Sequence, residues 1–207
     1  MTGLYRQVAS GLAPDDLPFM NYGYAERGAD AYAWIRPEDR AYKYHFSLAR
    51  RVLGGLPLQG ATMLEIGSGR GGNCGYLARY SGAAAILGID QCWENVAASR
   101  RAFAGAGFVC GDASRLPFAD ASFDVVLNIE SSHCYPDFAA FLAEVRRVLR
   151  PGGALAYTDI WFLNTLPYDW QGRLQALETC GLGIDQNGAL RRVHDNDAVH
   201  RRLQDRR

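Results

Sequence analysis

A glycine-rich stretch behind a short apolar run is the first feature of this sequence that could do chemistry. Glu65 ends the apolar run, Gly67, Gly69 and Gly71 recur at alternate positions, and Gly72 follows directly. Glycine lacks a Cβ atom and tolerates positive φ, so this spacing lets the chain turn sharply and bring its backbone close to a ligand. The next residues favour a helix, whose first N–H groups are unpaired and would point at that ligand. The spacing therefore predicts a site for a nucleotide-type ligand.

Two kinds of site share this spacing. Gly67-x-Gly69-x-x-Gly72 matches the dinucleotide fingerprint of NAD-dependent oxidoreductases, and Asp90 lies where the ribose-binding acid of that motif should fall. With Glu65 in front, the same loop also matches Glu-x-Gly-x-Gly-x-Gly, the first motif of class I S-adenosylmethionine-dependent methyltransferases. The loop alone does not separate these interpretations, so the rest of the chain has to.

The composition is that of an ordinary globular domain. The 207 residues are 48% hydrophobic and 21% charged, and their formal net charge is zero. A neutral chain gives no reason to expect capture of nucleic acid or of an anionic membrane surface. No apolar run approaches the roughly 20 residues of a membrane span, and the N-terminus does not resemble a signal peptide. We therefore expect a cytoplasmic protein whose five scattered cysteines are reduced and form no metal site.

Strands and helices are expected to alternate along the middle of the chain. The expected strands are 61–66, 84–89, 108–110, 123–129 and 154–157, and the expected helices are 38–53, 73–80, 94–103 and 137–149. This alternation predicts an α/β fold, a doubly wound, Rossmann-like and mostly parallel sheet. Ligands of such sheets bind beyond the carboxyl ends of the strands. Glu65, Asp90, Asp112, the stretch 128–133 and Asp159 all fall at those ends.

Over roughly residues 40–160 the chain resembles the class I S-adenosylmethionine-dependent methyltransferases, because five motifs occur in the expected order. They are Leu64-Glu65-Ile66-Gly67-Ser68-Gly69, Gly88-Ile89-Asp90, Gly111-Asp112-Ala113 with Leu116-Pro117-Phe118, Ser122-Phe123-Asp124-Val125-Val126, and Leu149-Arg150-Pro151-Gly152-Gly153. An NAD site predicts only the first two of them. The resemblance therefore implies S-adenosylmethionine as cofactor and S-adenosylhomocysteine as product.

A closer resemblance involves two further stretches. Asn21-Tyr22-Gly23-Tyr24 and the run from Asn128 through Glu130, His133 and Pro136 are similar to the phthiotriol-type methyltransferases of mycobacterial lipid synthesis. They also resemble sugar and polyketide O-methyltransferases of bacterial natural-product pathways. The resemblance implies a small, hydroxylated, rather apolar acceptor of natural-product or lipid type, although it does not identify that acceptor.

The resemblance also implies roles for individual residues in the cofactor site. Those residues are Glu65, Gly67, Ser68, Gly69 and Gly71 for the methionine moiety, Asp90 and Gln91 for the ribose, Asp112 and Ala113 for the adenine, Asn128 and Ile129 for the sulfonium side, and Tyr22 or Tyr24 for the carboxylate. From the residues alone, the alternative for Asp90 and Asp112 is a solvated loop residue or a helix cap.

Methyl transfer to oxygen is an in-line displacement that needs alignment of the reactants and a base for the acceptor's proton. The chemistry requires no metal. An unperturbed imidazole, with a pKa of about 6.5, accepts a proton at neutral pH. The resemblance implies that His133 is this base and that Asp159 is its partner, whereas a helix-entry residue bonded to backbone is the alternative for His133. Tyr135, Trp161 and Phe162 would wall the acceptor pocket or serve as ordinary packing residues.

Three parts of the chain are expected: an aromatic-rich arm and helix that could form a lid (1–54), the cofactor-binding domain (55–187) and a polar basic tail (188–207). After Asp159 we expect a helix at 171–179 and a sixth strand near 181–185, but the arginine-rich end predicts no seventh strand. The fold therefore looks C-terminally shortened, and its exposed sheet edge could be covered in a homodimer.

The sequence thus predicts an S-adenosylmethionine-dependent methyltransferase acting on an oxygen of a small acceptor. The alternatives are a protein of the same fold that binds the cofactor or catalyses a cyclisation without methyl transfer, and an NAD-dependent oxidoreductase.

Overall fold

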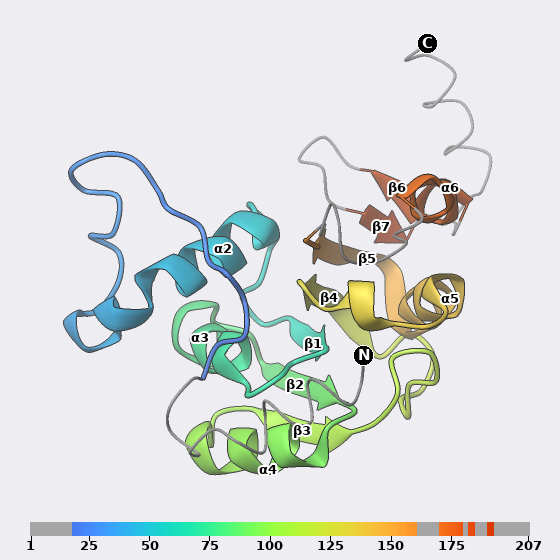
Figure 1. Ribbon diagram of the computed structural model, residues 1–207, viewed down its shortest axis with the longest axis horizontal. Helices are drawn as coiled ribbons and strands as arrows, with labels where there is room; N and C mark the ends of the chain where they lie inside the picture. The colour runs from blue at the N-terminus through green and yellow to red at the C-terminus, as the bar shows by residue number, and fades with distance from the viewer. Residues whose placement is uncertain (1–17, 161–169, 180–181, 185–189, 193–207) are drawn as a thin grey trace.

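A computed structural model describes residues 18–160, 170–179, 182–184 and 190–192, and within them the chain forms one seven-stranded sheet (Figure 1). The spatial order of the strands is β3-β2-β1-β4-β5-β7-β6. Strands β1 to β5 pair in parallel, whereas β7 is antiparallel to both β5 and β6. The strands are β1 Thr62–Ile66, β2 Ala85–Asp90, β3 Gly107–Cys110, β4 Phe123–Ile129, β5 Leu149–Thr158, β6 Leu182–Ile184 and β7 Leu190–Arg192. The expected doubly wound, mostly parallel α/β sheet is confirmed.

Helices cover both faces of the sheet. In Figure 1, α2 and α3 lie on one side of the sheet and α5 and α6 on the other. The helices are η1 Pro37–Tyr42, α2 Lys43–Leu53, α3 Gly72–Tyr80, α4 Trp93–Ala102, η2 Ser132–Cys134, α5 Phe138–Val148 and α6 Trp170–Thr179. None of the helices in the described part of the chain is long and apolar enough to span a bilayer.

The core follows from the alternation of side chains along the buried strands. In β1, Met63 packs with α2 and α3 in one cluster, and Leu64 packs with the α5 stripe in the other. Both side chains are fully buried, as are Phe141 and Val145 of α5. Burial of a side chain of this size stabilises the fold by roughly 2 kcal/mol. The two clusters hold β1, β2 and β4 rigidly, so the loops at their carboxyl ends are well positioned.

The structure differs from the expected elements in three places. The first expected helix divides into η1 and α2, with a 3-10 turn over Pro37–Tyr42. Strand β5 begins at Leu149 rather than at 154, because a register shift opposite Phe123–Val125 accommodates the Pro-Gly-Gly stretch within the strand. A seventh strand exists within the stretch expected to be a tail. Its sequence, Leu-Arg-Arg, has no apolar alternation that could reveal it.

The arm before η1 packs on the sheet domain. Phe19 is buried and stacks on the imidazole of His45 with ring centroids 4.9 Å apart. The backbone N–H of Tyr24 donates to the carbonyl of Tyr44 in α2 (2.8 Å). Residues 18–24 are therefore fixed along α2 and arrive next to the glycine-rich loop.

Candidate functional site

A cavity of about 700 Å³ opens at the carboxyl ends of β1, β2, β3 and β4, which is a size typical of small-molecule sites. Its walls come from the arm, the glycine-rich loop and the loops that follow these strands. The lining residues are 18–21, 65–69, 72–73, 89–92, 95, 111–113, 129–131 and 134–136. The position agrees with the rule that ligands of doubly wound sheets bind beyond the strand ends.

The floor of the cavity is glycine backbone. Gly67 and Gly69 both have positive φ, at +72° and +51°. A Cβ atom at Gly67 would lie 2.2 Å from Ser131 Oγ, and one at Gly69 would lie 3.0 Å from Met20 Sδ. No side chain fits at Gly67, and the left-handed conformation disfavours one at either position. The loop therefore presents bare backbone to a ligand, as the spacing predicts.

Glu65 lies beneath this loop and is only 2% exposed. Its Oε1 accepts from Asn73 Nδ2 (2.8 Å), and its Oε2 accepts from Cys74 Sγ (3.1 Å). Burial raises the pKa of Glu65 to about 7, although both hydrogen bonds oppose the rise. A carboxyl group with this pKa can change its charge when a cationic group of a ligand arrives nearby.

Asp90 holds the loop from the end of β2. Its Oδ2 accepts from the N–H of Gly69, and its Oδ1 accepts from the N–H of Cys92, both at 2.8 Å. Burial raises the pKa of Asp90 above its usual value, against the effect of these hydrogen bonds. Oδ1 also accepts from Asn95 Nδ2 (3.4 Å), whereas Oδ2 has a second lone pair that can accept from a ribose hydroxyl while Asp90 holds the loop.

Two buried oxygens beside the cavity lack hydrogen-bond partners among the described residues. They are Ser68 Oγ and Asn95 Oδ1, and both residues line the cavity. Buried polar atoms are nearly always satisfied in native proteins, so two orphans at one cavity indicate a polar ligand. The glycine floor, the acids and these oxygens together fit a cofactor with a sugar and an amino-acid moiety. The described residues contain no cluster of three His, Cys, Asp or Glu that could hold a metal ion.

The structure brings most of the expected cofactor residues together around the cavity. Those that line it are Glu65, Gly67, Ser68, Gly69, Asp90, Gln91, Asp112, Ala113 and Ile129, and Tyr135 of the expected acceptor pocket also does. Those that do not line it are Tyr22, Tyr24, Gly71, Asn128, His133 and Asp159. Trp161 and Phe162 lie outside the described residues.

Asn128 supports the wall from behind. Its side chain is fully buried, and its Nδ2 donates to the carbonyl of Ile66 (2.9 Å), to Ser131 Oγ (2.9 Å) and to the hydroxyl of Tyr135 (3.0 Å). These bonds fix the loop after β4 against the end of β1. Asn128 therefore supports the cavity wall without lining it.

The two arm tyrosines do not line the cavity. Tyr22 is 72% exposed, and the ring of Tyr24 lies 4.7 Å from the guanidinium carbon of Arg51. Asp112 lines the cavity, and its Oδ1 accepts from both the N–H and the hydroxyl of Ser114, which lowers the pKa of Asp112.

His133 and Asp159 form a buried pair at the ends of β4 and β5, as the sequence predicts. His133 Nδ1 lies 2.7 Å from Asp159 Oδ1, and the two side chains are 2% and 6% exposed. Burial by itself would lower the pKa of His133, but the bonds and charges of Asp159 and Cys134 outweigh it and raise this pKa to about 9. The expectation of an unperturbed imidazole was therefore wrong, because Asp159 stabilises the protonated form.

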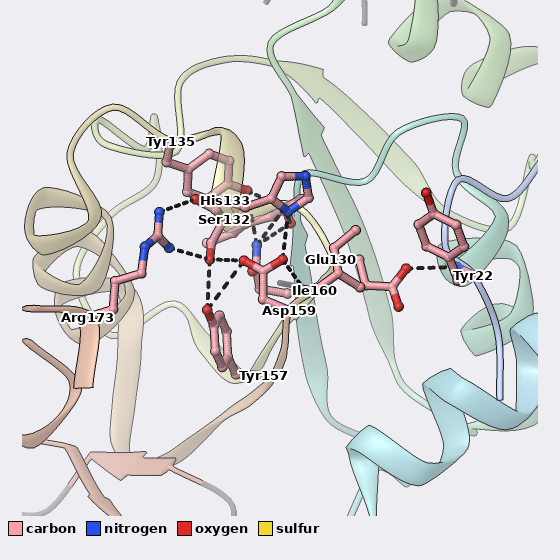
Figure 2. Close-up of polar contacts among 12 residues, drawn as sticks. Tyr22, Glu130, Ser132, His133, Tyr135, Tyr157, Asp159, Ile160 and Arg173 are labelled. Atoms are coloured by element: carbon pink, nitrogen blue, oxygen red, sulfur yellow. Dashed lines mark hydrogen bonds and ion pairs between the residues drawn. The ribbon is translucent and has the colours of Figure 1, made fainter. Parts of the chain in front are cut away.

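Further groups that the sequence did not single out hold this pair (Figure 2). Ser132 bonds through its hydroxyl to Asp159 and to the hydroxyl of Tyr157 (2.8 Å). Arg173 of α6 donates to Ser132 Oγ (3.1 Å) and to the carbonyl of Ser132 (3.0 Å). An arginine on a polar helix ordinarily indicates a solvated face, so no local pattern could have revealed this role.

Glu130 also lies in this region and had no expected role. It lines the cavity, its φ is +48°, and its Oε2 accepts from the backbone N–H of Tyr22 (2.8 Å). The available signal was its position just after the fourth strand, within the run shared with the phthiotriol-type enzymes.

Comparison with known proteins supplies independent information. A family model described as "Methyltransferase domain" matches residues 64–157. The chain is 38% identical over 206 residues to the phthiotriol/phenolphthiotriol dimycocerosates methyltransferase of Mycobacterium tuberculosis (strain ATCC 25618 / H37Rv), covering 98% of this chain and 76% of that protein. It is 42% identical over 173 residues to the fatty-acid O-methyltransferase of Mycolicibacterium smegmatis, covering 83% of this chain and 62% of that protein.

Solved structures share the architecture. The cyclase SpnF is 24% identical with a TM-score of 0.61, over 89% of this chain and 71% of that one. A methyltransferase-like protein of Bacillus halodurans is 20% identical with a TM-score of 0.59, over 68% of this chain and 70% of that one. At these identities the likeness is one of fold alone.

Proposed function

The chain belongs to the class I S-adenosylmethionine-dependent methyltransferases, and we propose that it methylates an oxygen atom of a lipid-like, hydroxylated acceptor with His133 as general base. Membership of this family makes the chain a methyltransferase with S-adenosylmethionine as cofactor, and it sets aside the NAD-dependent interpretation. The oxygen target, the acceptor class and the residue roles are the proposal. The observation that carries it is the buried His133–Asp159 pair beside the cofactor cavity.

The cofactor-binding residues hold and orient the cofactor and take no part in bond making. The backbone of Gly67 and Gly69, with Glu65 beneath it, would hold the methionine moiety, and Asp90, which fixes Gly69, would accept from the ribose hydroxyls. Ser68 supplies a buried hydroxyl that is free to bond the ligand. S-adenosylmethionine, when bound, supplies an electrophilic methyl group on a sulfonium, so these residues need only orient it.

His133 would remove the acceptor's proton. Asp159 lies 2.7 Å from Nδ1 of the imidazole, so we assign the transfer of the acceptor's proton to Nε2. Ser132, Tyr157 and Arg173 hold Asp159 and the loop in place. The imidazole is 2% exposed, so an acceptor reaches it only after neighbouring side chains move. Cys134, the next residue, already lines the cavity.

The names of the relatives support the acceptor class. One is a phthiotriol methyltransferase, and the other is a fatty-acid O-methyltransferase. A hydroxyl acceptor needs a base, whereas a fatty acid is already ionised at neutral pH. The raised pKa of His133 favours a second candidate, in which the imidazolium binds the carboxylate of a fatty acid and no base is needed.

An acceptor panel tests the proposal. The purified protein would be incubated with S-adenosylmethionine and a long-chain alcohol, a long-chain fatty acid, a free sugar or no acceptor, and S-adenosylhomocysteine would be quantified. We expect product only with the two lipid-like compounds. Product with the sugar alone would overturn the acceptor class. Tight cofactor binding without turnover for any compound would favour a non-methylating protein of this fold.

A further inference from the structure

The N-terminal arm forms one wall of the cofactor cavity. Residues 18–21 line the cavity, and two contacts fix them to the start of α3. The N–H of Gly72 donates to the carbonyl of Pro18 (2.9 Å), and Asn21 Nδ2 donates to Asn73 Oδ1 (3.1 Å). These contacts hold the arm on the side of the glycine-rich loop.

Between these contacts the arm covers the loop itself. Met20 is the arm residue nearest to Gly69, with its Sδ 3.0 Å from the position that a Cβ atom would take. The methionine moiety of the cofactor is expected at this loop. Met20 also lines the cavity, so a cofactor seated there would lie against the arm, and its release would need the arm to shift.

Tyr22, further along the arm, is held by the residue that follows β4. The carboxylate of Glu130 accepts the backbone N–H of Tyr22 at 2.8 Å, and Glu130 lines the same cavity. In Figure 2 the side chain of Glu130 points toward Tyr22 and away from Asp159. The second oxygen of this carboxylate has no hydrogen bond within the described part of the chain. The arm thus spans the cavity from α3 to β4, and one carboxylate closes the span.

The backbone at Glu130 is strained. Its φ of +48° lies in the left-handed region, and Ala121 is the other non-glycine residue with positive φ in the described part of the chain. Such a conformation costs free energy in a residue with a Cβ atom and is found preferentially at functional sites. Here the residue with this conformation is the one that connects the loop after β4 to the arm.

We propose that Glu130 is a positioning residue that fastens the arm over the bound cofactor, so that the Tyr22–Glu130 bond must open before the cofactor dissociates. The Asn21–Asn73 bond opens with it, whereas the backbone bonds Pro18–Gly72 and Tyr24–Tyr44 remain, so residues 20–23 move between these two fixed points. The inference rests on the cofactor site alone and is independent of the acceptor.

The dissociation rate of S-adenosylhomocysteine tests this proposal without any acceptor. It would be followed after displacement by excess S-adenosylmethionine, in the wild type and in variants of Glu130 and Tyr22. Glu130→Ala removes the acceptor of the bond and should raise the rate about tenfold, the effect expected for one hydrogen bond to a charged group. Glu130→Gln retains a carbonyl oxygen and should restore most of the slow dissociation. Glu38→Ala, at an exposed glutamate in η1, is the matched control.

Variants of Tyr22 test the other side of the bond. Tyr22→Pro removes the N–H, whereas Tyr22→Ala keeps it, so the first should accelerate dissociation far more than the second.

Glu130→Gly removes the carboxylate and also relieves the strained φ, so it should raise the melting temperature while it accelerates dissociation. Opposite changes in these two quantities distinguish positioning from a role in folding. Unchanged dissociation in Glu130→Ala, or equal effects of the two Tyr22 variants, would overturn the proposal.

Discussion

The pH dependence of kcat/KM for the acceptor tests how His133 works. Asp159 lies 2.7 Å from the imidazole and raises its pKa to about 9, so about 1% of His133 is neutral at pH 7. If neutral His133 is the base for a hydroxyl acceptor, kcat/KM should rise about tenfold per pH unit from pH 7 and level off near pH 9. If the imidazolium instead binds a carboxylate acceptor, kcat/KM should be flat at neutral pH and fall above pH 9.

Replacement of the partner gives the sharper test. Asp159→Asn removes the charge that favours the imidazolium, so the midpoint of the pH profile of kcat/KM should move down toward the unperturbed histidine pKa of about 6.5. The plateau rate should fall as well, because the amide no longer fixes the tautomer. Asp120→Asn is the matched control, since this carboxylate is 78% exposed and pairs with Arg147 outside the cavity. A wild-type midpoint near 6.5, or one that Asp159→Asn does not move, would refute the reasoning.

Three further outcomes follow from the site. Gly67→Ala should weaken binding of S-adenosylhomocysteine more than tenfold in calorimetry and lower the melting temperature, because the new Cβ atom would meet Ser131 Oγ at 2.2 Å; unchanged binding would contradict the backbone floor. The free energy of unfolding of Glu65→Gln, measured in urea, should increase relative to that of the wild type by about 3 kcal/mol when the pH is raised from 5 to 8. The folded-state pKa of Glu65, about 7, exceeds its usual 4.5, so the wild type loses stability as the pH rises between these values. A difference between the two proteins that does not change with pH would argue against this. Arg173→Leu should lower kcat about tenfold and leave calorimetric affinity for S-adenosylhomocysteine unchanged, because the bonds to Ser132 and the contact with the Phe138 ring lie outside the cofactor cavity; an equal loss of affinity would contradict that role.

The parts of the fold that sequence patterns predict are those that depend on local periodicity. Leu64 and its neighbours mark β1 because buried parallel strands are continuous apolar runs, and the stripe through Phe141 marks α5 at helical spacing. The loop of Gly67 is predictable because only glycine fits its conformation. The strand Leu190–Arg192 has no such pattern, and its pairing with β5 and β6 depends on contacts distant in sequence.

The functional site, like the fold, could be predicted from the sequence only in part. Residue types at strand ends indicate that Asp90, His133 and Asp159 gather at one edge of the sheet. They do not indicate side-chain direction, so Asn128 was expected to line the cavity although it faces Ile66 and Ser131 behind the wall. The raised pKa of His133 likewise depends on a partner 26 residues away, which only the folded chain brings close enough to outweigh the effect of burial.

The most direct test of the central claim is the position of the transferred methyl group. The protein would be supplied with S-adenosylmethionine labelled with ¹³C at the methyl carbon and with a long-chain hydroxylated or carboxylated acceptor, and the product would be identified by NMR. The account predicts a single labelled O-methyl signal, formed with an equal amount of S-adenosylhomocysteine and only when the acceptor is present. A label on carbon or nitrogen, or cofactor consumption that does not depend on the acceptor, would contradict it.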